Sequence, residues 1–128
     1  MSVKYFFPAL VWGVVIFAAI SMPPSSIPRT GLFAIPFADK IIHFLLFAIF
    51  GFLGSLGFFK QKKESVFHRR FIFLAIFAGL IYGTITELLQ HYYFTGRQGS
   101  GWDVVANFFG TVFGVILFRL AMKKNLNF

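Results

Sequence analysis

The sequence predicts an all-α integral membrane protein, a single domain of four transmembrane helices that occupies residues 1–128. Hydrophobic residues make up 58% of the chain and charged residues only 12%, which is typical of a membrane protein and not of a soluble domain. The apolar residues form four long runs, without the short alternating segments of a β-barrel. The chain has no cysteine, so disulfides and thiolate metal sites are excluded.

The four apolar runs cover about residues 5–22, 41–59, 71–90 and 102–122. As helices they would be roughly 27–31 Å long, enough to cross the hydrocarbon core of a bilayer. The first run resembles a signal peptide that ends at Ala19-Ile20-Ser21, but its length favours a retained span over a cleaved leader. Four prolines between residues 23 and 36 then break the helix and predict an extended loop.

The basic residues predict the orientation of the chain. Four spans place both termini and the loop of residues 60–70 on one side, which then holds nine of the 12 Lys and Arg residues. The positive-inside rule therefore predicts a multi-pass plasma-membrane protein with both termini in the cytoplasm. The net charge of +8 is explained by this orientation and by contact with anionic lipids, so we expect membrane lipids and no nucleic acid as partners.

Polar residues gather at the expected outer ends of the last three spans. Glu87 and Gln90 share a helix face with two glycines, because steps of three and four return to the same side. Glycines let helices approach closely, and polar groups in a membrane must face protein or water. We therefore expect a shared pocket that opens to the outer side. Its predicted ligand-binding residues are Lys40, His43, Glu87, Gln90, Arg97, Asp103 and Asn107.

Glu87 is the residue for which we favour a functional role. A carboxylate costs on the order of 2–3 kcal/mol at the bilayer centre, so it needs a partner to stay ionised. The available cations are Lys40, Arg97 and protonated His43. The catalytic candidates, if the protein is an enzyme, are Glu87 or Asp103 as the base and His43 as the acid.

The other polar residues also have structural explanations. Asp39 fits a helix cap, and Asp103 fits both a capping box with Ser100 and a functional role. Arg97 suits a clamp to a nearby carboxylate or an anion receptor. Asn107 is best explained as an interhelical hydrogen-bonding residue, like Gln90.

His43 could form a hydrogen bond within the bundle or carry a proton, since histidine titrates near neutral pH. One histidine with scattered carboxylates is a weak metal pattern, so neither a metal nor another cofactor is predicted.

The ordered set of polar residues resembles the VanZ-like family of small bacterial membrane proteins. The resemblance runs over about residues 37–120 and rests on Asp39-Lys40-x-x-His43, Glu87-x-x-Gln90, Arg97, Asp103, Asn107 and Gly110. It departs from the family after Arg97, where Gln98-Gly99-Ser100-Gly101 stands in place of an acidic or serine-rich stretch. The resemblance implies a four-helix membrane protein linked to the cell envelope or to teicoplanin-type glycopeptide resistance, and it implies no catalytic roles.

Three functions remain open from the sequence. The protein could bind an anionic, lipid-linked or glycopeptide-related envelope component, with Lys40 and Arg97 receiving the anion. It could instead be an enzyme that acts on lipid-linked intermediates by acid–base chemistry, with Arg97 stabilising developing charge. The third function is a structural or assembly role. The sequence predicts no particular oligomeric state.

Overall fold

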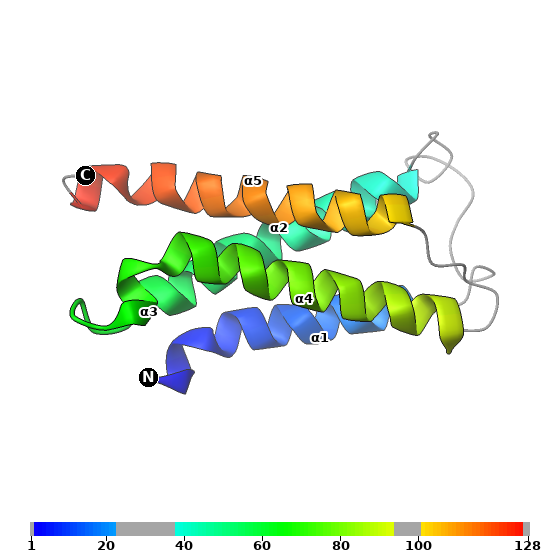
Figure 1. Ribbon diagram of the computed structural model, residues 1–128, viewed down its shortest axis with the longest axis horizontal. Helices are drawn as coiled ribbons and strands as arrows, with labels where there is room; N and C mark the ends of the chain where they lie inside the picture. Colours follow the sequence, from blue (N-terminus) through cyan, green and yellow to red (C-terminus); the bar gives the residue numbers. More distant parts are fainter. Residues whose placement is uncertain (1, 23–37, 94–100, 127–128) are drawn as a thin grey trace.

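The computed structural model describes residues 2–22, 38–93 and 101–126, and those parts contain helices and no strand (Figure 1). Four of the helical segments are long and apolar enough to cross a membrane, which confirms the predicted all-α class. The elements are the 3₁₀ helix η1 (Val3–Phe6), α1 (Phe7–Ser21), α2 (Ala38–Phe59), α3 (Val66–Arg69), α4 (Phe71–Tyr92) and α5 (Gly101–Leu126).

The observed helices differ from the predicted ones mainly at their ends. α2 begins at Ala38 and not near Ile41, so Asp39 lies in its first turn. The short helix α3 was not predicted, because residues 60–70 read as a basic loop. α3 begins where the Ser65 hydroxyl accepts a hydrogen bond from the backbone nitrogen of His68 at 3.2 Å, a side-chain cap. The predicted proline-rich loop lies outside the described residues.

η1 at the start of the described chain and the last turns of α5 lie at the same end of the bundle as α3 (Figure 1). α2 and α5 both start at the opposite end and run in the same direction, whereas α1 and α4 run toward that end. The first turns of α2 and α5 therefore meet the last turns of α4. This arrangement explains how polar residues from three separated segments reach one place.

Glycines set the spacing of the helices. Gly110 and Gly114 of α5 lie directly against the backbone carbonyls of Phe44 and Ala48 in α2, and Gly51 of α2 lies against the carbonyl of Thr111. Any side chain at these positions would collide with a main chain. α2 and α5 therefore pack at backbone contact, as small residues spaced by four allow in membrane helices.

The first helix packs against α2 and α4 through directional contacts as well as apolar ones. The Trp12 indole N–H donates to the carbonyl of Leu46 at 2.8 Å, and the Tyr82 hydroxyl donates to the carbonyl of Gly13. Ile16 and Ile20 form an apolar core with Phe47. Large apolar side chains such as Leu10 and Phe73 are exposed on the outside, which suits contact with lipid tails.

We predict that Gly114→Ala destabilises the bundle by about 1–3 kcal/mol, because the added methyl group overpacks a backbone-to-backbone contact. Gly54→Ala is the matched control, since no atom lies within 4 Å of a methyl group there. Thermal unfolding of both variants in detergent would measure the difference. Equal melting temperatures for the two variants would contradict the packing described above.

Candidate functional site

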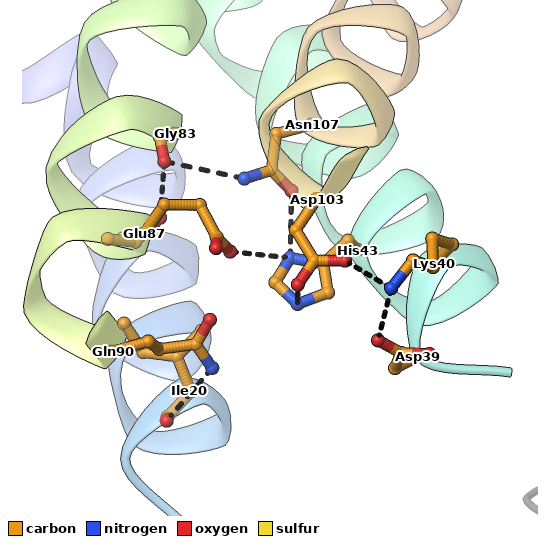
Figure 2. A network of polar contacts seen from close by, with 10 residues as sticks. Ile20, Asp39, Lys40, His43, Gly83, Glu87, Gln90, Asp103 and Asn107 are labelled. Carbon is orange, nitrogen blue, oxygen red and sulfur yellow. Dashed lines mark hydrogen bonds and ion pairs between the residues drawn. The ribbon is translucent and has the colours of Figure 1, made fainter. Parts of the chain in front are cut away.

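The candidate site lies at the end of the bundle opposite the termini, where α2, α4 and α5 meet (Figures 1 and 2). α2 contributes Lys40 and His43 from its first turns, and α4 contributes Glu87 from its last turns. α5 contributes Asp103 and Asn107. Each helix thus presents polar residues on the stripe that carries its packing glycines.

His43 is at the centre of the cluster. Its Nδ1 atom lies 2.9 Å from Oδ1 of Asn107 and 3.8 Å from Oε1 of Glu87, and its Nε2 atom lies 3.9 Å from Oδ2 of Asp103 (Figure 2). These four residues are only 1–5% exposed. A histidine thus has a carboxylate near each ring nitrogen, inside the protein.

Asn107 fixes the direction of the His43 ring. Its amide nitrogen donates to the carbonyl of Gly83 in α4 at 3.4 Å, so its amide oxygen faces the histidine. An amide oxygen only accepts hydrogen bonds, and Nδ1 of His43 must therefore carry a hydrogen. In the neutral ring the lone pair is then on Nε2, on the side of Asp103. In the protonated ring both N–H groups have a carboxylate nearby.

Lys40 connects this buried group to the surface. Its Nζ atom lies 3.0 Å from Oδ2 of Asp39 and 3.1 Å from Oδ1 of Asp103. The Lys40 side chain is 33% exposed, that of Asp39 is 57% exposed and that of Asp103 is 5% exposed. Lys40 therefore lies at the rim, with one partner near solvent and one inside.

One predicted site residue, Gln90, does not join this group, and another lies outside the described residues. Gln90 is buried, but its amide nitrogen donates to the carbonyl of Ile20 at 3.2 Å and so ties α4 to α1. Figure 2 shows the Gln90 amide nitrogen directed at the Ile20 oxygen, with no contact drawn to His43. Arg97 lies outside the described residues, as does Ser100 of the expected capping box.

The structure narrows the structural and functional explanations given above for Asp39 and Asp103. Asp39 lies within the first turn of α2, where a carboxylate suits the helix dipole, and it pairs with Lys40. Asp103 lies in the first turn of α5 and also contacts two side chains of α2. A helix-start role and a site role are therefore compatible for Asp103.

Sequence reasoning missed the backbone part of this site. The carbonyl of Gly83 accepts hydrogen bonds from Asn107 and from the hydroxyl of Thr86 at 2.9 Å, and Thr86 is fully buried. The carbonyl of Ile20 is the partner of Gln90. No side-chain pattern signals which main-chain oxygens will be used. The threonine three residues after a packing glycine is the one local hint.

These side chains can donate and accept hydrogen bonds and hold charge at a place that is largely buried from solvent. Buried charges cost several kcal/mol each unless they are paired and hydrogen-bonded. Lys40 and His43 are the two groups in the described cluster that can carry positive charge, facing the carboxylates of Asp39, Glu87 and Asp103. The cluster is therefore suited to bind a charged group or to move a proton.

Comparison with known proteins found no matching family model, no matching curated protein and no matching solved structure. The resemblance to the VanZ-like family thus rests on the ordered residues of the sequence, and the ligand-binding roles of those residues stay predictions.

We predict that His43 and Asn107 are energetically coupled. Asn107→Leu removes the acceptor of the His43 N–H and leaves a buried donor unsatisfied, which costs about 1–3 kcal/mol. A double-mutant cycle with His43→Leu, measured by unfolding in detergent, is expected to give a coupling energy of about 0.5–1.5 kcal/mol. Additive effects of the two substitutions would show that the 2.9 Å contact does not contribute to stability.

Proposed function

We propose that this protein is a VanZ-like integral membrane protein of the bacterial cell envelope that binds an anionic, lipid-linked envelope component at its polar cluster. The observation that carries the proposal is Lys40, a rim lysine held between an exposed and a buried carboxylate. In this proposal it contributes to glycopeptide resistance of the teicoplanin type, as the family resemblance implies.

Lys40 can exchange one of its two carboxylate partners for a ligand anion. Its contact with Asp39 is solvent-exposed and is worth little, because water and ions compete with such a pair. Its contact with Asp103 is buried on the carboxylate side and holds the ammonium group in place. A phosphate or carboxylate from a ligand can take the place of Asp39 without disturbing Asp103. Lys40 would then be a positioned point charge for an anion.

The location of the cluster favours a ligand that arrives from the membrane. It lies at the end of the bundle opposite the termini, which the distribution of basic residues assigns to the outer side. An apolar crevice of about 430 Å³ also lies between α1, α2 and α4, and Gly13, Phe50 and Tyr82 are among its lining residues. A lipid tail fits such a crevice, while a charged head needs the polar end.

We predict that Lys40→Gln weakens binding of undecaprenyl phosphate by at least tenfold, since it removes the charge that receives the phosphate. Titration of purified protein with this lipid, followed by native mass spectrometry, measures the change. Lys60→Gln is the control, because Lys60 is an exposed lysine at the other end of the bundle. Equal affinities for wild type and Lys40→Gln would refute the assigned role of Lys40.

The same test extends to cells. Expressed in a susceptible bacterium, the wild-type protein is expected to raise the minimum inhibitory concentration of teicoplanin, and Lys40→Gln to abolish the increase at equal membrane abundance. Resistance that persists in the variant would separate the drug phenotype from the rim lysine.

One observation favours a second candidate function, that of a membrane enzyme with acid–base chemistry. Asn107 holds Nδ1–H of His43, so the neutral ring has its lone pair on Nε2 and can take a proton. Incubation of the purified protein with lipid-linked envelope intermediates tests this candidate by mass spectrometry of the lipids. Conversion that His43→Ala abolishes would establish an enzyme and overturn a purely binding role.

A further inference from the structure

We propose that His43, Glu87 and Asp103 together bind one divalent transition-metal ion, of the class of Zn²⁺ or Mn²⁺. Each residue offers one ligand atom, and these atoms lie within 4.8 Å of one another. The three side chains come from three different helices, and the two carboxylates both face the His43 ring (Figure 2). Binding of the ion does not depend on the lipid ligand proposed above.

The spacing within the cluster fits an ion better than direct hydrogen bonds. Nε2 of His43 lies 3.9 Å from Oδ2 of Asp103 and Nδ1 lies 3.8 Å from Oε1 of Glu87, whereas a direct hydrogen bond spans about 2.7–3.2 Å. A bridging water would need roughly 4.5 Å or more between its two partners. An ion with bonds of about 2.0–2.2 Å places its ligand atoms about 3.0–4.4 Å apart. An ion can use only one nitrogen of the His43 ring, and Nε2 is the nitrogen that Asn107 leaves open. The 3.9 Å between Nε2 and Oδ2 of Asp103 lies inside that range. One ligand atom from each of the three residues lies within 4.8 Å of the other two, so a small movement of Glu87 completes the set.

The surroundings supply the contacts that hold metal ligands in place. A histidine ligand usually has a hydrogen-bond partner on its second nitrogen, and His43 has Asn107 at Nδ1, which leaves Nε2 for the ion. Asp103 uses Oδ1 for Lys40, while Oδ2 faces the histidine. Glu87 has three rotatable side-chain bonds, which allow its oxygen to approach an ion bound by the other two residues.

The ligand types select the class of metal. Imidazole suits Zn²⁺ and its transition-row neighbours, and carboxylates suit harder ions such as Mn²⁺. The absence of cysteine from the chain excludes a thiolate site for Cu⁺. A divalent ion with two carboxylates also forms a neutral unit, which lowers the cost of keeping these groups inside a membrane.

The sequence alone predicted no metal, because one histidine and scattered carboxylates have no diagnostic spacing. His43, Glu87 and Asp103 lie far apart in the chain, and only the packing of the helices brings them together. The metal site proposed for them therefore replaces the expectation of no metal.

The full-length protein, purified in detergent and stripped with a chelator, tests the proposal with metals alone. Incubation with excess Zn²⁺ followed by desalting is expected to leave about one ion per chain by elemental mass spectrometry. Co²⁺ in the same site is expected to give visible absorption bands that Zn²⁺ removes. Less than about 0.1 ion per chain, without Co²⁺ bands, would overturn the proposal.

Two variants and two controls locate the site. Glu87→Gln keeps the size of the side chain, and His43→Gln removes the imidazole; each is expected to weaken Zn²⁺ binding by about 10–100-fold. Glu64→Gln changes an exposed carboxylate at the other end of the bundle and His91→Gln an exposed histidine at the same end, and both should bind like wild type. Unchanged binding by a folded Glu87→Gln variant, checked by circular dichroism, would show that the ion does not use this cluster.

Failure of this test would leave the lipid-binding proposal standing, because that proposal is measured on Lys40 with a lipid and no added metal. Metal binding without lipid binding would leave the metal site standing in turn.

Discussion

The backbone contact between α2 and α5 is the constraint on which the rest of the structure depends. Gly110 lies against the carbonyl of Phe44, the residue next to His43, and Asn107 lies one turn before Gly110. The helix axes are therefore held at the shortest distance that two main chains allow. At that distance the Asn107 amide reaches the histidine ring directly, at 2.9 Å. A larger residue at Gly110 would move apart the two helices that carry the site.

Gly83 positions α4, the third helix of the site, in two ways. Gly83 of α4 lets the Asn107 side chain approach closely, and its carbonyl also accepts a hydrogen bond from that side chain. One turn further along the same face, Glu87 reaches His43. The same residue thus provides both a close helix contact and a hydrogen-bond acceptor for the site. This explains why the polar cluster directly adjoins the glycine contacts and does not lie elsewhere along the helices.

The sequence predicted the spans and their inward faces, because hydropathy and helical periodicity are properties of single helices. Gly79, Gly83, Glu87 and Gln90 share a buried face in the structure, as their spacing predicted. The partners across helices could not be predicted in the same way. Gln90 bonds the backbone of Ile20, which no sequence pattern identifies. The 3.8 and 3.9 Å gaps at His43 likewise depend on interhelical distances that glycine content indicates only qualitatively.

Stability alone does not account for the charged residues of the cluster. Glycine packing and a few neutral bonds already hold the helices together, as in the bond from Tyr82 to Gly13. Replacing buried ion pairs with apolar side chains is often neutral or stabilising, because desolvation offsets the attraction between charges. A bundle under selection for stability alone has no need of Glu87, Asp103 and His43 in one place. Their concentration at one end, beside a partly exposed lysine, supports the charged ligand proposed for this cluster.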